Sequence, residues 1–434
     1  MRDFKGKKVL VYGMGTSGQS ACKLLHKKGA CVSFYDDEDK FGSFFAFDKN
    51  PTLHKYDFVV LSPGVKILGN EIISHFTLTR TPIISELDLA YFFCKGKIIG
   101  ITGTNGKTTV TSMVYQILKE SGKKVFSCGN IGLPFSSVCE EGGKDSIYVC
   151  EVSNFQLESS RYFHAGLACV LNIAPDHIDR HGTYQEYIAV KRKIIAKRHQ
   201  KVVLNFDDEI ARSFKISKKV LYFSKKMLSR GVFVKNNAVY FNKTKIISCS
   251  DIPFFGLKNL ENVMAAVAIC VKLKVKAKVI RQGILSYKLP PHRLEYVGQT
   301  KGAHVFDDSK ATNISSVQMA VEALGGARLV LLMGGQNKNI NFDDFFSKKY
   351  EFEKLYCFGE AGEEIYNCAK RFGYNPQLFK TMKACVHFVR DHLEEGQVIL
   401  LSPGCASFDE FASYAVRGEV FKEIMFDCYE KIEY

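Results

Sequence analysis

The sequence lacks several features that would place it in other classes of protein. It has no CxxC pair, and its 14 cysteines are scattered, several inside apolar runs, as at Cys150, Cys169 and Cys270. This pattern indicates buried thiols in a reducing compartment and argues against a disulfide framework or a zinc site. No apolar run reaches the roughly 18 residues of a membrane helix, and the N-terminal apolar stretch is too short for a signal peptide. We therefore expect a cytoplasmic protein that does not insert into a membrane.

A basic stripe interleaved with aromatic residues is also missing, although the formal net charge is +15. The lysines occur in dispersed pairs, which is not the pattern of a nucleic-acid-binding surface. A basic chain fits small phosphorylated ligands equally well. We expect no nucleic-acid partner, and the motifs below favour nucleotides.

The chain of 434 residues is long enough for about three domains of roughly 150 residues each. Short apolar runs alternate with helical patterns, which is typical of βαβ units and parallel sheets. Most of the predicted strands end in Gly, Asp or Ser-Pro-Gly, and ligands collect at the carboxyl ends of strands in open α/β sheets. Two boundaries divide three such blocks, one at Cys94 and one near Leu289, where Pro290 and Pro291 break the chain.

A predicted phosphate-binding loop, Gly103–Thr109, lies between an apolar strand at Lys97–Thr102 and a helix. Its glycines would let backbone N–H groups close around phosphate oxygens, and the helix N-terminus adds partial positive charge. Lys107 would reach the β- and γ-phosphates, and the Thr108 hydroxyl would bind Mg²⁺. The strict spacing GxxxxGK is not met, because Ile101 occupies the first glycine position.

A second glycine turn, Gly13–Gly18, matches G-x-G-x-x-G between a strand and a helix, and Asp36 ends the next strand. Taken alone it predicts a dinucleotide site with Asp36 on a ribose. A site for another nucleotide diphosphate and a purely structural turn are the alternatives. An NAD-dependent oxidoreductase would leave the phosphate loop unexplained. Two nucleotide turns on one chain suggest one nucleotide as a substrate handle and ATP as the energy source.

Three further side chains follow the phosphate loop at strand ends or on a helix. Glu151 ends an apolar strand, where a carboxylate can hold a Mg²⁺ ion that bridges phosphates. His177 follows another strand and could bind a second metal, with Asp176 orienting its imidazole. Lys191 lies on a helix that is basic outside and apolar inside, so the residue pattern alone predicts a solvated lysine.

Taken together, these segments resemble the Mur ligases, the ATP-dependent amino-acid ligases of peptidoglycan synthesis, over essentially the whole chain. The matching segments are GMGTSG, LSPGV, TGTNGKTT, GNIGLP, EVSNFQLE, DHIDRH, LPPHRLE, DDSKATN, MGGQNK and LSPGCASFDEF. DDSKATN, the last segment and the short first domain are similar to the branch that adds D-glutamate to UDP-N-acetylmuramoyl-L-alanine. Folylpolyglutamate synthase, a ligase of related architecture, should lack the roughly ninety residues that precede the phosphate loop here.

The resemblance implies an α/β fold with three domains. These are a Rossmann-like UDP-substrate domain at 1–94, a central P-loop ATPase-type parallel sheet at 95–289, and a Rossmann-like amino-acid-binding domain at 290–434. It also implies a monomer that uses ATP and two Mg²⁺ ions, takes UDP-N-acetylmuramoyl-L-alanine and D-glutamate, and passes through an acyl phosphate.

The resemblance further implies roles for individual residues. Contacts to the UDP-linked substrate are implied for Thr16, Ser17, Asp36, Ser62, Pro63, Gly64 and Asn130. Nucleotide contacts are implied for Gly103, Thr104, Asn105, Gly106, Lys107, Thr108, Thr109, Asn259, Asn262, Arg293 and Asp308. Metal positions are implied for Thr108, Glu151, His177 and Lys191, the last as a carbamoylated lysine. Lys310 would lie near the reacting phosphates with Lys107, His177 and Lys191. Contacts to D-glutamate are implied for Thr312, Lys338, Ser407 and Tyr414.

Three positions depart from the family's pattern. Asn154 stands where Ser is common, Gln336-Asn337 where Asp-Gly is common, and Tyr414 where Phe is known. None of these changes removes a charge that the chemistry needs, so only fine substrate contacts are affected.

Overall fold

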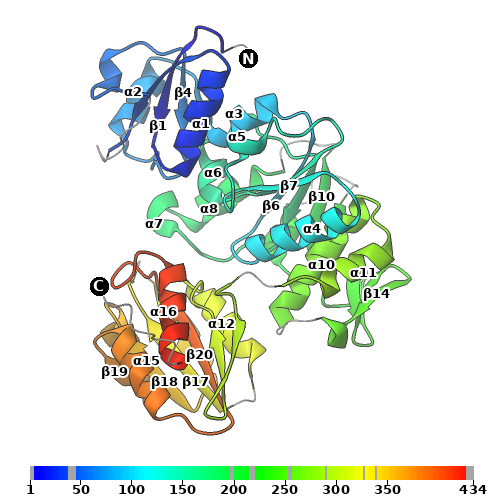
Figure 1. The fold of residues 1–434 in the computed structure, drawn as a ribbon, viewed down its shortest axis with the longest axis vertical. Coiled ribbons are helices and arrows are strands. Elements are labelled where there is room, and N and C mark those ends of the chain that lie inside the picture. Colours follow the sequence, from blue (N-terminus) through cyan, green and yellow to red (C-terminus); the bar gives the residue numbers. More distant parts are fainter. Residues whose placement is uncertain are drawn as a thin grey trace. The chain divides into compact units, whose positions relative to one another are not determined.

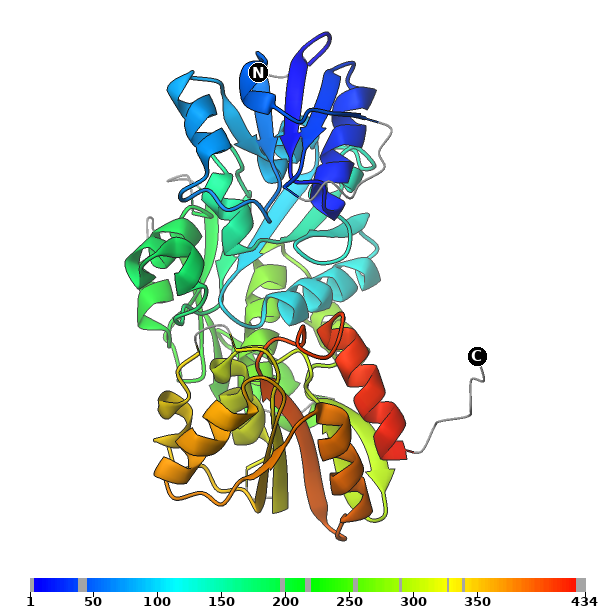
Figure 2. The same cartoon turned by 90° about the vertical axis from the view of Figure 1, so that its left-hand side faces the viewer.

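The structure, a computed structural model, describes residues 4–37, 45–195, 200–214, 220–252, 257–288, 291–325, 328–337 and 340–426. Its strands form three separate sheets, each accompanied by its own helices (Figure 1 and Figure 2). The chain divides into two compact units, Met1–Ile252 with Glu261–Tyr287, and Pro253–Leu260 with Lys288–Tyr434. The first unit contains the first two sheets, and the second unit contains the third.

The first sheet is parallel, with the strand order β3-β2-β1-β4-β5. Its strands are β1 Lys8–Tyr12, β2 Cys31–Tyr35, β3 Ala46–Phe47, β4 Phe58–Leu61 and β5 Ile83–Ser85, and its helices are α1 Thr16–Lys27, α2 Glu71–Leu78 and α3 Glu86–Phe93. The β1–α1 turn requires glycine, because Gly13 has a φ of +91° and a Cβ on Gly18 would lie 1.8 Å from the Gly13 carbonyl oxygen.

The second sheet has nine strands in the order β14-β13-β12-β11-β10-β9-β6-β8-β7, and only the β12–β13 and β13–β14 pairs are antiparallel. Its strands are β6 Lys97–Thr102, β7 Val125–Gly129, β8 Ile147–Glu151, β9 Leu167–Val170, β10 Lys201–Asn205, β11 Val220–Ser224, β12 Val232–Lys235, β13 Ala238–Phe241 and β14 Thr244–Ser248. Its helices are α4 Lys107–Glu120, α5 Phe135–Val138, α6 Asn154–Ser159, α7 Ile178–His181, α8 Tyr184–Arg192, α9 Glu209–Ser213, α10 Leu257–Lys272 and α11 Ala277–Leu285. β8 is buried along its whole length, as expected for a parallel strand covered on both faces.

The first two sheets share one hydrophobic core. Leu25 of α1, Leu87 of α3 and Phe135 of α5 belong to a single cluster of buried side chains. Asp88, at the start of α3, is fully buried and accepts hydrogen bonds from the backbone N–H groups of Arg161, Tyr162 and Phe163 at 2.7–2.9 Å. The boundary predicted at Cys94 therefore lies inside one compact unit, and the division into domains there stays a prediction.

The third sheet has the order β15-β16-β20-β17-β18-β19 and is parallel apart from the β15–β16 hairpin. Its strands are β15 Glu295–Thr300, β16 Ala303–Asp307, β17 Arg328–Gly334, β18 Lys354–Phe358, β19 Gln377–Phe379 and β20 Gln397–Gly404. Its helices are α12 Ile314–Ala323, α13 Asp343–Phe346, α14 Gly362–Arg371, α15 Met382–Asp391 and α16 Tyr414–Phe426. Two hydrophobic clusters, one with α12–α14 and one with α15 and α16, form the core of this unit.

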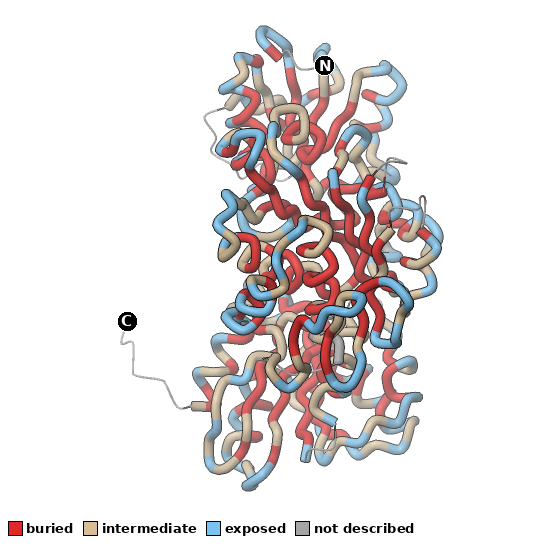
Figure 3. Tube along the Cα trace, turned by 90° about the vertical axis from the view of Figure 1, so that its right-hand side faces the viewer, coloured by how far each residue is buried: buried red, intermediate tan, exposed pale blue. Residues whose placement is uncertain are grey.

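The predicted α/β fold class is confirmed by these parallel-dominated sheets. Buried residues follow the strands in all three of them (Figure 3). Of the thirteen cysteines within the described ranges, ten are buried and none forms a disulfide. No helix among the described residues combines the length and apolarity needed to cross a bilayer.

Candidate active site

A cavity of about 580 Å³ lies in the first unit, at the carboxyl ends of strands from both of its sheets. It is lined by Tyr12, Gly13, Gly15, Thr16, Ser17, Asp36, Asp37, Ser62, Pro63, Gly64, Val65, Gly129, Asn130, Gly132, Pro134 and Gln156. All seven residues that the sequence assigned to the UDP-linked substrate are among them. The structure thus brings them together around one space, while their roles stay predictions.

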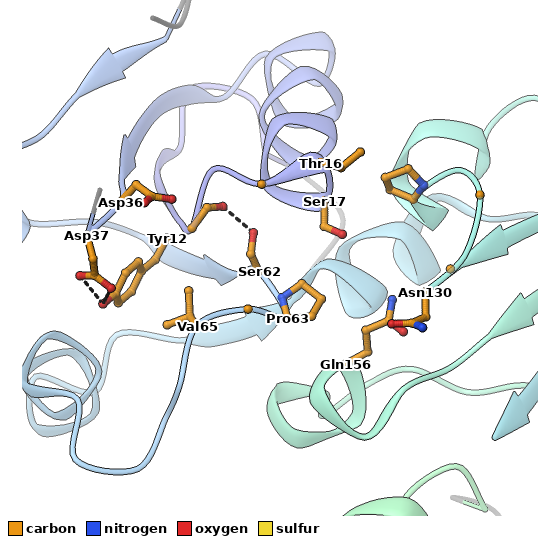
Figure 4. A pocket seen from close by; sticks show the side chains of 16 residues that line it. Tyr12, Thr16, Ser17, Asp36, Asp37, Ser62, Pro63, Val65, Asn130 and Gln156 are labelled. Atoms are coloured by element: carbon orange, nitrogen blue, oxygen red, sulfur yellow. Dashed lines mark hydrogen bonds between the residues drawn. The ribbon is translucent and has the colours of Figure 1, made fainter. Parts of the chain in front are cut away.

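One end of this cavity carries a pair of acidic side chains (Figure 4). The Tyr12 hydroxyl donates to Asp37 at 3.0 Å and accepts from the Asn70 amide at 2.8 Å. Burial raises the pKa of Tyr12 to about 12, so its hydroxyl stays protonated and remains a donor. Asp36 accepts from the Met14 N–H at 2.5 Å and so braces the glycine turn. Sequence reasoning missed Tyr12 and Asp37, although Asp37 follows Asp36 directly.

The other end of the cavity carries amide side chains, those of Asn130 and Gln156 (Figure 4). Asn130 donates from Nδ2 to Oε1 of Glu151 at 2.8 Å. Glu151 is 2% exposed, and its Oε2 is buried without a hydrogen-bond partner among the described residues. A buried carboxylate oxygen left in this way fits a cation ligand, because an unpaired buried charge is costly. Gln156 was not predicted.

The phosphate loop lies between β6 and α4, as the sequence predicts. Gly106 has a φ of +83°, and a Cβ there would lie 2.2 Å from Oδ1 of Asn262, so the Asn262 side chain faces the loop backbone. The Lys107 ammonium donates to the carbonyl oxygens of Gly103 and Thr104 at 2.9 and 2.8 Å. Thr108 is buried in the first turn of α4.

Lys191 is 1% exposed, so the expectation of a solvated lysine, drawn from the residue pattern alone, is wrong. Its ammonium donates to the Gly103 carbonyl oxygen at 2.8 Å and lies 4.8 Å from the centroid of the Tyr187 ring. Tyr187 and Lys191 are four residues apart on α8 and are both buried on its inner face. Burial, reinforced by the charge of Lys107, holds the pKa of Lys191 well below its usual value, although Asp176 and Glu151 oppose the shift.

His177 precedes α7 in the left-handed conformation, with a φ of +52°. Its Nε2 lies 3.6 Å from Oδ2 of Asp176, which is longer than a hydrogen bond. Its ring centroid lies 4.7 Å from that of Phe155. The metal role of His177 and the orienting role of Asp176 stay predictions.

In the second unit, Asp308 directly follows β16 and is buried. Its carboxylate accepts from the Ser402 hydroxyl at 2.9 Å and from the Leu294 N–H at 3.1 Å. Burial raises the pKa of Asp308 to about 7, against the opposing charge of Arg293. The residue therefore keeps a proton more readily than an exposed aspartate does.

Of the residues assigned to D-glutamate, Thr312 and Ser407 lie in loops of this unit, and Tyr414 begins α16. The Lys310 ammonium is 4.7 Å from the centroid of the Tyr414 ring, Ser407 is buried, and Thr312 is exposed. The buried Arg417, which had no sequence signal, donates to the carbonyl oxygens of Ser309, Cys405 and Ala406 at 2.8–3.1 Å. It thereby ties the DDSKATN and SPGCASFDEF segments together. Lys338 and the side chain of Asn259 lie outside the part of the chain that the structure describes.

Comparison with known proteins agrees with this arrangement. Two family models match, the Mur ligase middle domain over residues 101–270 and the Mur ligase, glutamate ligase domain over residues 292–405. The chain is 37% identical to a UDP-N-acetylmuramoylalanine--D-glutamate ligase of Lachnoclostridium phytofermentans, over 97% of this chain and 98% of that one. It is 35% identical to the enzyme of the same name from a Thermoanaerobacter species, over 97% and 98%.

The fold also matches solved structures. A crystal structure of MurF from Acinetobacter baumannii superimposes with a TM-score of 0.64 at 16% identity, and covers 98% of this chain and 92% of that one. These findings confirm the resemblance drawn from the sequence motifs. The chain belongs to the Mur ligase family.

Proposed function

We propose that this Mur ligase joins D-glutamate to UDP-N-acetylmuramoyl-L-alanine in the cytoplasm, with hydrolysis of ATP to ADP and phosphate. The names of its relatives support the two substrates. The observation that carries the proposal is the hydrogen bond from Asn130 to Glu151. This bond joins Asn130, in the wall of the substrate cavity, to the buried carboxylate of Glu151. The charge of Glu151 in turn acts on Lys191, whose ammonium donates to the Gly103 carbonyl oxygen of the phosphate loop.

A carboxylate does not condense with an amine in neutral water, because hydroxide is a poor leaving group. Transfer of the γ-phosphoryl group of ATP to the substrate carboxylate gives an acyl phosphate and ADP. The D-glutamate amine then attacks the acyl carbon, and phosphate leaves from a tetrahedral intermediate. The protein's task is to position three anionic groups and to offset their charge.

Residues of the phosphate loop perform much of this task. The first turn of α4 can receive phosphate oxygens through its backbone N–H groups, because a helix N-terminus carries partial positive charge. The Lys107 ammonium, which donates to two carbonyl groups of the loop, supplies a positive charge for the β- and γ-phosphates. Lys310 is assigned to the reacting phosphates, and Thr312, Lys338, Ser407 and Tyr414 are assigned to D-glutamate.

Mur ligases use Mg²⁺ with ATP, and the described residues fit such a cation. Oε2 of Glu151, which has no hydrogen-bond partner within the described ranges, and the Thr108 hydroxyl are oxygen ligands of the kind that Mg²⁺ prefers. When bound, the ion offsets the negative charge of the triphosphate. We assign Thr108 and Glu151 to one ion, and His177 and Lys191 to a second.

An ammonium group cannot bind Mg²⁺, so the assignment of Lys191 requires a carbamate. Its lowered pKa favours the neutral amine. The amine nitrogen can then form a bond to the carbon of CO₂ and release a proton to solvent. The two oxygens of the carbamate would then replace the ammonium group, whose positive charge is costly in this buried position.

A phosphate-release assay tests the proposal. The enzyme is supplied with UDP-N-acetylmuramoyl-L-alanine, ATP and Mg²⁺, and with D-Glu, L-Glu, L-Lys or meso-diaminopimelate in separate reactions. We expect phosphate release with D-Glu only, and none when the UDP-linked substrate is omitted. Efficient release with L-Lys or meso-diaminopimelate would place the chain in another branch of the family.

A further inference from the structure

Arg180 connects three segments of the first unit through one side chain. It lies in α7, three residues after His177. Its Nε and Nη2 donate to Oε2 of Glu158 at 2.9 and 2.7 Å. Nη2 also donates to the Val65 carbonyl oxygen at 2.7 Å, and Nη1 donates to that of Gly64 at 3.2 Å. One guanidinium therefore joins α7, α6 and the loop after β4.

The two carbonyl groups belong to the wall of the substrate cavity. Gly64 and Val65 both line it, next to Ser62, whose hydroxyl donates to the Gly13 carbonyl oxygen (Figure 4). Ser62 thus fastens one end of this turn to the glycine turn, and Arg180 fastens the other end to the second sheet's helices. The position of this wall depends on both contacts.

Arg180 is also connected to His177 through the ring of Phe155. The guanidinium carbon lies 4.3 Å from the centroid of the Phe155 ring, and that ring lies 4.7 Å from the His177 ring. Phe155 is thus in contact with both side chains. Glu158 is held in turn, because the Lys193 ammonium donates to its carbonyl oxygen at 2.8 Å.

Burial makes these contacts strong. The side chains of Arg180 and Glu158 are 11% and 13% exposed, so water screens their interaction little. A guanidinium offers several donors in one rigid plane, whereas a lysine ammonium is a compact charge on a flexible stem. Only arginine can serve the carboxylate and both carbonyl groups at once.

We propose that Arg180 is a positioning residue for the UDP-linked substrate, which holds the Gly64–Val65 wall of the cavity in register with His177. The inference rests on the proposed function. The residue touches neither substrate nor metal in this role. It acts through the backbone of the turn and through Phe155.

Binding of UDP-N-acetylmuramoyl-L-alanine alone, without ATP or Mg²⁺, tests the proposal by calorimetry. For Arg180→Met and Arg180→Lys we expect the Kd to rise about tenfold to a hundredfold, the loss typical of a removed hydrogen bond to a charged group. The KM for ATP should stay within about twofold of the parent, because the hydrogen bonds of the Arg180 guanidinium go to Glu158 and to the Gly64–Val65 wall of the cavity. Arg281→Met, which breaks an exposed Arg–Asp pair with 52% and 38% exposed side chains, is the matched control and should bind normally.

Chemical rescue separates positioning from a general structural role. Added guanidinium should restore binding to Arg180→Ala, as long as thermal melting shows a folded protein. A folded Arg180→Met protein with the parental Kd would overturn the proposal. An equal weakening of the interaction with the UDP-linked substrate and with ATP, which guanidinium does not relieve, would also overturn it. If the parent protein fails to bind the UDP-linked substrate, the proposed function is wrong. If the parent and the Arg180 variants bind it with the same Kd, only the positioning role of Arg180 is wrong.

Discussion

Lys107 and Lys191 donate hydrogen bonds to the same acceptor, the carbonyl oxygen of Gly103, at 2.9 and 2.8 Å. Two ammonium groups on one oxygen repel each other, and Lys191 is also almost fully removed from water. Both effects disfavour its charged form. The pair therefore explains why one lysine can act as a cation while the other is available as a neutral amine.

Replacement of Lys191 by alanine should leave the enzyme nearly inactive, because the carbamate oxygens are lost. The space vacated by the side chain can hold a short carboxylic acid, so acetate should restore part of the activity. Phosphate release with and without acetate measures this, and the parent in acetate is the control. Full activity of Lys191→Ala without rescue would rule out the carbamate.

Replacement of Lys107 by alanine should lower kcat at least about a hundredfold, the typical effect of losing one preorganised charge stabiliser. The protein should stay folded, since the Lys107 ammonium donates to carbonyl groups of its own loop. Lys119→Ala, at the exposed end of the same helix, is the matched control and should keep parental turnover. Near-normal turnover of Lys107→Ala would contradict the phosphate-loop assignment.

The raised pKa of Asp308 predicts a pH-dependent stability. The folded protein holds this proton up to about pH 7, whereas the unfolded chain releases it near its ordinary pKa of 3.8. The contribution of this proton to the free energy of unfolding is therefore complete below about pH 4, and it is lost as the pH rises through 7. Asp308→Asn should unfold with a flatter pH dependence, and at pH 8 it should be more stable than the parent by at most about 4 kcal/mol.

Denaturant unfolding of both proteins at pH 5 and pH 8 measures this difference. Since Asp308 is also assigned to nucleotide binding, the variant should lose activity while it gains stability. If the free energy of unfolding changes equally with pH in parent and variant, the Asp308 carboxyl does not titrate in this range.

We expect Asp88→Asn to lower the stability of the protein strongly, because the Asp88 carboxylate accepts several hydrogen bonds in a buried position. One carboxylate oxygen accepts from the N–H groups of Ser85 and Arg161, and the other from Tyr162, Phe163 and the Ser160 hydroxyl. In Asp88→Asn an NH₂ group must face N–H donors, so buried groups lose their partners. We expect a loss of about 2–5 kcal/mol in the free energy of unfolding.

The exposed Asp145→Asn is the control for this change, and it should alter stability by less than about 0.5 kcal/mol. Thermal or urea unfolding provides the measurement. A loss for Asp88→Asn as small as that of the control would mean that water replaces the missing acceptor.

Local patterns predicted the parts of the site that depend on local geometry. The glycine turns Gly13–Gly18 and Gly103–Thr109 were identified because tight βα turns need residues without a Cβ, and the structure has them where expected. Glu151 was identified because a carboxylate directly after an apolar strand is difficult to solvate. Periodicity failed for Lys191, since a helix of nine residues has too few turns to distinguish its buried face from its basic one.

The α/β class, the two glycine turns and the family could be predicted from the chain alone, because each is encoded in residues close together along it. Which distant residues meet became visible in the folded protein. It joined Tyr12 to Asp37, Asn130 to Glu151, and Arg180 to the Gly64–Val65 turn. These contacts depend on the packing of whole sheets and helices, which brings a donor on one element to an acceptor on another, and no spacing along the chain records that match.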